Sequence, residues 1–582
     1  MVEIERDVIL AYALENAVKH DGKAVVGSVL SGLFAEGLEK SEIGKTMPKI
    51  TEVVKEVNSI ELSKQKEMFE GLVDKVSKRE VRVGLPELED AKVGEVIMRF
   101  APFPSGPLHL GNARPLILND EYVKKYRGKL ILAMDDTIGS EQKPIEPEAY
   151  KLIEEGVRWL GANVEKKIFY KSDRIDKYYE YADELIKKGY MYVCSCSQDK
   201  FKELKDKGIE CPCRQYPHDV QFKKWKDMFS APEKSVVVRL KTSMQDKDPA
   251  FRDRVMFRIS DRPHPRIGTK YRVYPTLDFA WAVDDHILGI THILRGMELA
   301  IETRVERFIW DIFKWKHPKV IYNGHFEIEG VKISKSKGAK DVKSGEYFGW
   351  NDPRVWSLQS LRDRGIQPQA IREFILNMGL RMTNVTVPID VLYSLNRKVL
   401  GDVKRYFFIS NPQKIKINGC PVLESDVPFH PNRSLGFRKY KTGQEFLISK
   451  QDFDNFEDGN YRLMHILNFK TDKVKRLMPR EFSFTSTEPP TDHVPIYMQW
   501  LSSDGENVPV RVLMEDGTWV EGLGEPELKK LEVGMVVQFE RFGYVRFHSL
   551  RDSLDDESRV GDEKGGAKMK KGKVMEFWFT HY

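Results

Sequence analysis

The sequence predicts an α/β protein in which a doubly wound domain lies between a helical N-terminal domain and all-β C-terminal barrels. Apolar residues at helical spacing fill roughly the first 90 positions, and short apolar runs alternate with helices from about Val93. After about Asn411 the chain changes to short β-rich runs separated by turn residues. The chain has 582 residues, and at roughly 100–200 residues per domain this length predicts about three to five domains and excludes a lone binding module.

The net charge of the chain is small for its size. Lys and Arg total 94 against 88 Asp and Glu, a formal charge of +6, which excludes a histone-like or polybasic protein. Any nucleic-acid partner must therefore be met by a local basic face. The acidic N-terminus MVEIERD and the absence of an uncharged apolar run of about 18 residues predict a cytoplasmic protein with no signal peptide and no membrane span.

The N-terminal region has the pattern of a helical domain. Apolar residues from Leu10 to Val18 share one stripe of a helix that ends at Asp21-Gly22. We expect a second helix from about Lys23 and one long charged helix from about Pro48 to Lys78.

Alternating strands and helices follow. We expect strands over 96–100, 130–134 and 167–170, with helices over 108–126, 147–160 and 173–188. Such alternation predicts a parallel, Rossmann-like sheet with right-handed crossovers, whose ligands bind at the carboxyl ends of the strands.

Hairpin signals dominate the C-terminal region. Strand patterns over 510–514 and 518–520 flank Gly517, and those over 535–539 and 544–547 flank Gly543. Short antiparallel strands of this kind predict barrel-like β-domains.

The sharpest motif is the segment RFAPFPSGPLHLGN, residues 99–112, which runs from the first strand into a helix. Its prolines and Gly106 predict a rigid turn, and Gly111 would let backbone or nucleotide approach closely. The helix start offers unpaired N–H groups to a phosphate, and His109 would lie beside that phosphate as a donor.

A second motif, KISKS at residues 332–336, follows an expected strand over 326–328. Two lysines flanking a serine on a loop could neutralise a triphosphate while charge builds on the leaving pyrophosphate. A lysine-rich pentapeptide by itself is usually a solvated turn. Phosphate binding is predicted here because the same chain also contains the His-x-Gly segment.

Four of the five cysteines fall in two close pairs, Cys194/Cys196 and Cys211/Cys213. Paired thiolates in a reducing compartment predict tetrahedral zinc with four sulfurs, with His218 as an alternative ligand. The alternative is a set of reduced thiols left from a lost metal site. Cys420 is isolated and is expected to be an ordinary buried residue.

His109-Leu110-Gly111-Asn112 and the KISKS segment resemble the two signatures of class I aminoacyl-tRNA synthetases. Arg99-Phe100-Ala101-Pro102 and Leu294-Arg295-Gly296 resemble the archaeal and eukaryotic-like glutamyl-tRNA synthetases, over about residues 93–582. The resemblance implies activation of L-glutamate by ATP with Mg²⁺ and transfer of the glutamyl group to tRNA(Glu). It also implies non-discriminating use of tRNA(Gln).

The resemblance assigns domains along the chain. We expect a helical N-terminal domain whose partner is unknown (1–90), two catalytic halves (91–190 and 271–340), an acceptor-stem insertion with a zinc knuckle (191–270), a helical stem (341–405) and two anticodon-binding barrels (406–582). Lysines and aromatic residues interleaved near the cysteines, from Lys200 to Lys226, would contact tRNA phosphates and bases.

The resemblance also assigns site residues. The implied ATP contacts are Ala101, Pro102, Phe103, Pro104, Gly106, His109, Gly111, Asn112 and Lys335, and the implied catalytic set is His109, Asn112, Lys332, Ser334, Lys335 and Ser336. The implied amino-acid pocket consists of Arg99 on a substrate carboxylate, Asp135 on the ammonium, Arg295 on the side-chain carboxylate, Leu277 and Trp281.

Two positions depart from the family pattern. Leu277 stands where a Tyr is common, and Ile138-Gly139 stands where an Asp/Asn-Pro pair is usual. The rival functions are a glutaminyl enzyme, which would have an uncharged residue in place of Arg295, and a tRNA-binding protein without catalysis.

Overall fold

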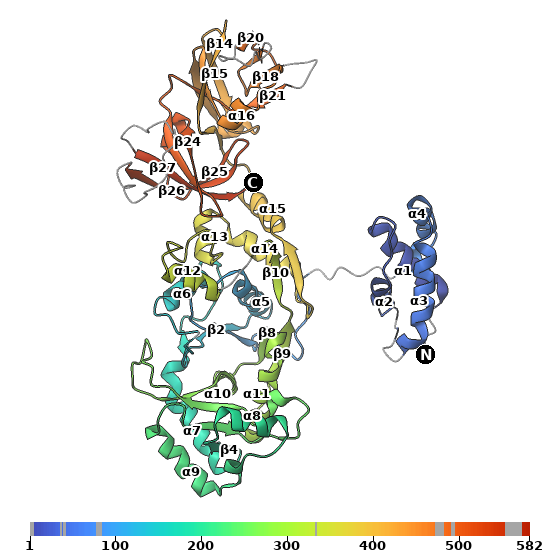
Figure 1. Ribbon diagram of the computed structural model, residues 1–582, viewed down its shortest axis with the longest axis vertical. Helices are drawn as coiled ribbons and strands as arrows, with labels where there is room; N and C mark the ends of the chain where they lie inside the picture. The colour runs from blue at the N-terminus through green and yellow to red at the C-terminus, as the bar shows by residue number, and fades with distance from the viewer. Residues whose placement is uncertain are drawn as a thin grey trace. The chain divides into compact units, whose positions relative to one another are not determined.

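The computed structural model describes residues 5–34, 36, 38, 42–76, 84–141, 143–331, 335–471, 482–489, 495–552 and 573–582. The chain forms two compact units, Met1–Val83 and Gly84–Tyr582, and Figure 1 follows the chain by colour from blue to red. Across these described ranges, no helix is both long enough and apolar enough to cross a membrane.

The first unit is helical, as predicted. Its helices are α1 (Arg6–Lys19), α2 (Val26–Leu33), α3 (Ile43–Val57) and α4 (Leu62–Glu70). They enclose a core that includes Ile9, Leu14, Val53 and Val57, all of which are buried.

The single long helix expected over 48–78 is wrong, because the chain breaks between α3 and α4. Asn58 ends α3 and uses its side chain on Ala24, with Oδ1 accepting from the Ala24 N–H at 2.6 Å and Nδ2 donating to the Ala24 carbonyl at 3.0 Å. The buried Gln65 amide donates to the Val57 carbonyl at 2.8 Å. Side-chain bonds to distant backbone groups here replace the bonds of a continuous helix.

The second unit begins with the predicted parallel sheet. Strands β1 (Ile97–Phe100), β2 (Lys129–Met134) and β3 (Phe169–Tyr170) pair in that order and alternate with α5 (Leu110–Lys125), α6 (Ala149–Trp159) and α7 (Ile175–Lys187). Later in the chain come α10 (Leu277–Ile287), β8 (His292–Gly296), α11 (Ala300–Phe313) and β9 (Lys319–Asn323), with β8 and β9 parallel.

The sheet reverses its strand order beside β1. On one side β1 pairs with β2, and on the other the Thr291 N–H, just before β8, donates to the Ile97 carbonyl at 2.9 Å. The crevice at such a reversal, at the carboxyl ends of the strands, is where ligands of this fold bind. Arg99 and Arg295 lie toward the ends of the two strands that flank the reversal.

The segment between α7 and α10 forms an antiparallel sheet. It consists of β4 (Met191–Cys194), β5 (Val237–Leu240), β6 (Val255–Ile259) and β7 (Val273–Pro275), and it is accompanied by α8 (Gln198–Asp206) and α9 (His218–Asp227) (Figure 1).

A helical region follows the parallel sheet. Strand β10 (Phe326–Glu329) pairs in parallel with β11 (Val385–Pro388), and the accompanying helices are α12 (Lys335–Lys343), α13 (Leu358–Arg364), α14 (Pro368–Met378) and α15 (Ile389–Leu400).

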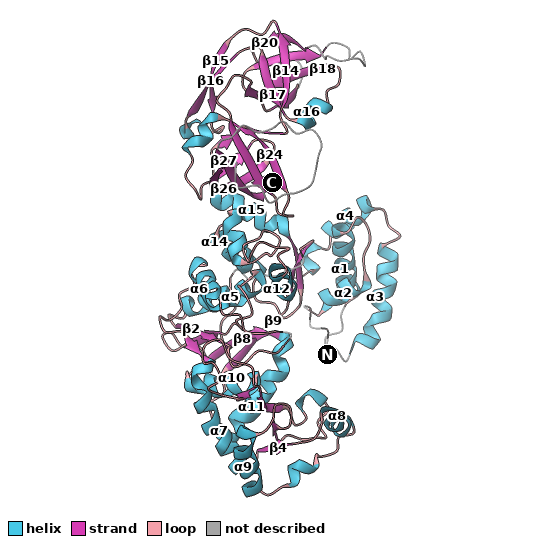
Figure 2. Cartoon of the chain, turned by 60° about the vertical axis from the view of Figure 1, so that its left-hand side comes forward, coloured by secondary structure: helices cyan, strands magenta, loops and turns pink. Residues whose placement is uncertain are grey.

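The rest of the chain is mostly strand (Figure 2). In chain order its elements are β12 (Arg405–Tyr406), β13 (Phe408–Ser410), β14 (Gln413–Asn418), β15 (Leu423–Pro428), β16 (Phe437–Thr442), β17 (Glu445–Ile448), α16 (Lys450–Asp454), β18 (Gly459–Leu463), β19 (Leu467–Thr471), β20 (Phe482–Ser486), β21 (Ile496–Met498), β22 (Leu501–Ser502), β23 (Val508–Leu513), β24 (Trp519–Gly524), β25 (Val536–Phe539), β26 (Gly543–Asp552) and β27 (Lys573–His581).

Strands β15 and β16 pair with each other in a two-stranded antiparallel sheet, and the other strands form two larger sheets, one of which lies within the sequence of the other. One, the inserted sheet, has the order β21-β18-β19-β20-β14-β17-β22, and the other, the terminal sheet, has the order β12-β25-β26-β27-β23-β24-β13. Both predicted hairpins, β23–β24 and β25–β26, are present in the terminal sheet. The inserted sheet therefore interrupts the terminal sheet after β13.

Arg364 joins the helical region to the terminal sheet. This buried residue at the end of α13 donates to the carbonyls of Phe579 (3.3 Å) and Thr580 (3.0 Å) on β27. Its Nη2 also donates to Tyr393 Oη (3.1 Å) and to Glu515 Oε2 (2.9 Å).

Replacing Arg364 should loosen this joint. We expect Arg364→Met to lower the free energy of unfolding by about 2–4 kcal/mol, because buried carbonyls lose their donor. The measurements are the urea midpoint and hydrogen exchange along β27. Arg362→Met is the matched control, since Arg362 lies on the same helix with 39% of its side chain exposed and, within the described part of the chain, bonds to the neighbouring Asp363. Equal effects of the two variants would contradict the role of Arg364.

Candidate active site and cysteine centre

The loop after β1 is tied to the end of β2. The Pro102 carbonyl accepts from the Asp135 N–H at 3.0 Å, and the Pro104 carbonyl accepts from the Glu146 N–H at 2.9 Å. Gly106 has φ +146°, and a Cβ there would lie 2.9 Å from the Trp350 ring. Glycine is thus required at this turn both for its backbone conformation and for space.

His109 caps the start of α5. Its Nδ1 accepts from the Gly111 N–H at 3.0 Å, and Asn112 Oδ1 accepts from the His109 N–H at 3.4 Å. Because Nδ1 is an acceptor, the neutral imidazole carries its hydrogen on Nε2. The reason for Gly111 differs from the one expected: a Cβ there would lie 2.7 Å from His109 Cε1, so this glycine makes room for the histidine ring.

The KISKS segment is only partly described. Lys332 and Ser334 lie outside the described residues, and Lys335 and Ser336 are the first residues of α12, with their side chains outside the description.

The residues predicted for the amino-acid pocket are brought together around Trp281. The guanidinium groups of Arg99 and Arg295 lie 4.6 and 4.9 Å from the Trp281 ring centroid. The Lys171 ammonium lies 4.8 Å from the same ring and 2.9 Å from Asp135 Oδ1. Leu277, the first residue of α10, lies one turn before Trp281.

Each cation of this pocket has a buried carboxylate partner. Arg99 makes a bidentate ion pair with Asp285, in which Nε donates to Oδ1 and Nη2 donates to Oδ2 at 2.9 Å. Arg295 Nη1 donates to Glu306 Oε2 at 2.8 Å, and both side chains are at most 2% exposed. Burial raises the pKa of Glu306 to about 7, against the opposing effect of Arg295.

Sequence reasoning missed Lys171, Asp285 and Glu306. Lys171 directly follows β3, so the rule that ligands bind at the carboxyl ends of parallel strands could have found it. Asp285 lies in the last turn of α10 and Glu306 in the middle of α11, and no local pattern marks either residue.

The pocket keeps buried donors without partners. Among the described residues, Trp281 Nε1 and the Nε and Nη2 of Arg295 are buried and make no hydrogen bond. Buried polar groups are nearly always paired, so unpaired donors indicate a site for an acceptor, and next to arginine that acceptor is an anion.

Comparison with known families identifies the family of this chain. Residues 95–402 match the family described as tRNA synthetases class I (E and Q), catalytic domain. The chain belongs to this synthetase family. Residues 403–482 and 497–548 match its anti-codon binding domains.

Relatives of this synthetase match nearly its full length. The glutamate–tRNA ligase of Pyrococcus abyssi is 40% identical over 566 residues, 94% of this chain and 98% of that protein. The glutamate–tRNA ligase of Methanocaldococcus jannaschii is 39% identical over 541 residues, 92% of this chain and 96% of that protein. A crystal structure of a glutamate tRNA ligase from Elizabethkingia meningosepticum aligns with a TM-score of 0.37 and 18% identity, over 53% of this chain and 70% of that one.

The synthetase also gathers its paired cysteines. The ligand atoms of Cys194, Cys196, Cys211 and Cys213 all lie within 4.8 Å of one another. Sγ–Sγ distances include 3.6 Å for Cys194–Cys211, 3.3 Å for Cys196–Cys211 and 3.9 Å for Cys196–Cys213. His218, the alternative ligand, is not part of this group. It is the first residue of α9, and its ring packs against Gly189.

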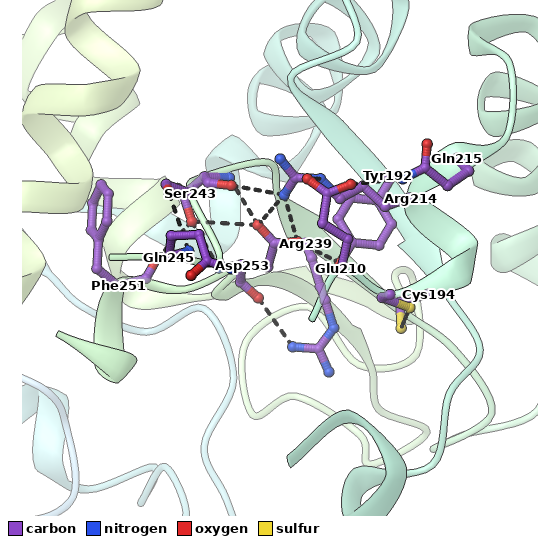
Figure 3. A network of polar contacts seen from close by, with 12 residues as sticks. Tyr192, Cys194, Glu210, Arg214, Gln215, Arg239, Ser243, Gln245, Phe251 and Asp253 are labelled. Atoms are coloured by element: carbon purple, nitrogen blue, oxygen red, sulfur yellow. Dashed lines mark hydrogen bonds and ion pairs between the residues drawn. The ribbon is translucent and has the colours of Figure 1, made fainter. Parts of the chain in front are cut away.

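A buried carboxylate organises the segments that carry these cysteines (Figure 3). Asp253 accepts from Tyr192 Oη at 2.8 Å, from the Thr242 N–H at 2.9 Å and from Arg214 Nη1 at 2.6 Å. Tyr192 lies on β4 with Cys194, and Arg214 follows Cys213. Asp253 therefore joins the segments that carry both cysteine pairs to each other and to the sheet.

A large groove of about 1030 Å³ opens beside Cys196. Its lining is rich in basic residues, namely Lys202, Lys205, Lys234, Arg239, Arg252, Arg254, Arg258 and Arg262. The Arg239 guanidinium stacks on Phe201, 3.3 Å from the ring centroid. The groove continues to Leu277 and Asp278 on α10, the helix that carries Trp281.

Proposed function

We propose that this synthetase is a glutamate–tRNA ligase that activates L-glutamate with ATP and transfers it to the 3′ end of tRNA(Glu). The observation that carries this proposal is the buried cluster around Trp281, in which Arg99, Lys171 and Arg295 each face a carboxylate and two donors of Arg295 have no hydrogen-bond partner among the described residues. The relatives named glutamate–tRNA ligase, similar over nearly the whole chain, support the same activity.

The charges of glutamate match the groups of the pocket. Its side-chain carboxylate would accept from Nε and Nη2 of Arg295, the buried donors that lack a partner among the described residues. Arg99 would contact the α-carboxylate, and Asp135 the ammonium. Because Lys171 already pairs with Asp135 at 2.9 Å, the substrate ammonium would share that carboxylate with a resident cation.

Adenylate formation is an in-line displacement at the α-phosphate of ATP, so the protein must position the reactants and stabilise charge. We assign phosphate binding to the start of α5, where Gly111 orients His109 so that Nε2 carries the donor hydrogen. Asn112 holds the cap in place. Ala101 to Pro104 and Gly106 would shape the nucleotide side of the loop, and Lys332, Ser334, Lys335 and Ser336 keep the roles implied by the family signature. Mg²⁺ would enter with ATP.

We further propose the domain roles expected from the sequence, with the acceptor insertion over 191–270 and the anticodon barrels over 406–582. The basic groove suits a single-stranded 3′ end, since its lining supplies cations for the phosphates. Use of tRNA(Gln) as a second substrate and a cytoplasmic location stay predictions.

The cysteine cluster would hold structural zinc. Tetrahedral Zn–S bonds of about 2.3 Å place sulfurs about 3.8 Å apart. Three of the six Sγ–Sγ separations, 3.3–3.9 Å, lie close to this value, all four sulfurs lie within 4.8 Å of one another, and the four thiols would complete the ligand set without His218. Zinc would there crosslink the segments after β4 and before α9.

Amino-acid dependence of ATP–pyrophosphate exchange, measured with tRNA transcript present, tests the function. We expect exchange with glutamate to exceed exchange with glutamine by at least about tenfold, because a site built for a charged group rejects a neutral isostere. Labelled glutamate should then charge transcripts of both tRNA(Glu) and tRNA(Gln). Faster exchange with glutamine would identify a glutaminyl enzyme, and no aminoacylation at all would indicate a tRNA-binding protein.

Changes at the start of α5 and at Lys335, the first residue of α12, should slow adenylate formation. We expect His109→Ala, Lys335→Ala and Gly111→Ala each to reduce exchange by at least about tenfold with nearly unchanged tRNA affinity, the last because its Cβ displaces the His109 ring. Gly44→Ala is the control, a helical glycine of α3 with nothing within 4 Å of the added Cβ. Wild-type exchange in His109→Ala and Lys335→Ala together would refute the assignment.

Metal content tests the cysteine centre. Protein purified without chelator should contain about one zinc per chain, and Cys211→Ser should lose it and melt at a lower temperature. Cys420→Ala, which changes a buried cysteine outside the cluster, should retain the metal. A wild-type preparation without zinc would contradict a structural zinc site.

A further inference from the structure

The Arg295 guanidinium has hydrogen-bond partners at Nη1, whereas its Nε and Nη2 donors have none among the described residues. Its Nη1 donates to Glu306 Oε2 at 2.8 Å and to Thr303 Oγ1 at 3.0 Å. Its Nε and Nη2 are buried and make no hydrogen bond with the described residues. The guanidinium is planar, so fixing Nη1 also fixes the direction of the other donors.

Both acceptors come from one face of α11. Thr303 and Glu306 are three residues apart and therefore lie side by side on the helix. The Thr303 hydroxyl donates to the Leu299 carbonyl at 3.2 Å, so its oxygen can accept from Arg295. The anchor thus consists of a carboxylate and a hydroxyl whose orientations are set by the helix.

We propose that Glu306 is a positioning residue that makes the amino-acid pocket select a side-chain carboxylate over a carboxamide. This inference rests on the proposed function, because it concerns the substrate side chain that Arg295 would bind. Glu306 does not touch the substrate and acts through Arg295.

The selectivity follows from hydrogen-bond geometry. Two fixed N–H donors side by side match the two acceptor oxygens of a carboxylate. A carboxamide offers one acceptor and one NH₂ group, so one arginine donor would face another donor in a buried site. An Arg295 released from Glu306 could turn away from the NH₂ group, and the penalty against glutamine would fall.

The surroundings of Glu306 add a charge effect. Arg295 of β8, Asp285 of α10 and Arg99 of β1 face its carboxyl group, and burial is the main cause of its pKa near 7. Below this pH Glu306 is neutral and still accepts from Arg295. Above it, a second carboxylate competes with the substrate for the same guanidinium, so the KM for glutamate should rise with pH.

Three variants separate these effects, using the full chain with tRNA transcript present. Glu306→Leu removes the acceptor at similar volume, and we expect the KM for glutamate to rise at least about tenfold, more than kcat falls, with the glutamate/glutamine ratio of kcat/KM reduced at least about tenfold. Glu306→Gln keeps an acceptor and should retain glutamate KM and selectivity within about threefold. Glu302→Leu is the matched control: Glu302 lies one turn earlier on α11 and pairs with Arg254, so glutamate KM and selectivity should not change.

Two further readouts keep the test decisive. From pH 6 to 8.5, the KM for glutamate should rise in the wild type and stay nearly flat in Glu306→Gln. If Glu306→Leu does not fold, Thr303→Val, which removes the weaker anchor, should still lower selectivity about two- to fivefold. Unchanged selectivity in Glu306→Leu, or in Thr303→Val if the former is unfolded, would overturn the positioning role. A wild-type protein inactive with glutamate would instead overturn the proposed function.

Discussion

Pairing of buried opposite charges is the constraint on which the catalytic half of the synthetase depends. Arg99–Asp285 joins β1 to α10, Arg295–Glu306 joins β8 to α11, and Lys171–Asp135 joins the ends of β3 and β2. Removing one partner of a buried pair leaves an uncompensated charge and costs about 3–5 kcal/mol, so each pair fixes the relative placement of two elements. The residues around Trp281 are therefore held in place by ion pairs within the protein itself.

The sequence revealed the parts of this site that local patterns encode. Strands β1 and β2 and the hairpins β23–β24 and β25–β26 follow from alternation and turn residues, and Arg99, Asp135 and Arg295 follow from motifs at strand ends. Their carboxylate partners were not predictable, because Asp285 and Glu306 lie on helices whose faces are set only by tertiary packing. The break at Asn58 was missed for the same reason, since its side chain bonds to Ala24, far away in sequence.

In the cysteine centre, too, local sequence predicted the ligands but not the residue that holds their segments together. The spacing of Cys194, Cys196, Cys211 and Cys213 was enough to predict that the thiols meet. The role of Asp253 was not, because this buried aspartate lies on another segment and has φ +38°, a backbone conformation that no sequence pattern announced. Polar groups that hold a site together from a distance leave little trace in local sequence.

Because the inserted sheet lies within the sequence of the terminal sheet, the order in which the chain can fold during synthesis is constrained. Strand β13 pairs with β24 and β12 pairs with β25, so more than 100 residues must leave the ribosome before either early strand finds its neighbour. The inserted sheet has all its strands once β22 (Leu501–Ser502) has emerged, whereas the terminal sheet also needs β27 (Lys573–His581). In nascent chains β12 and β13 should therefore keep unpaired backbone N–H and C=O groups while the inserted sheet folds. Unpaired strands of this kind can pair with other chains, so the protein needs protection from aggregation during this interval.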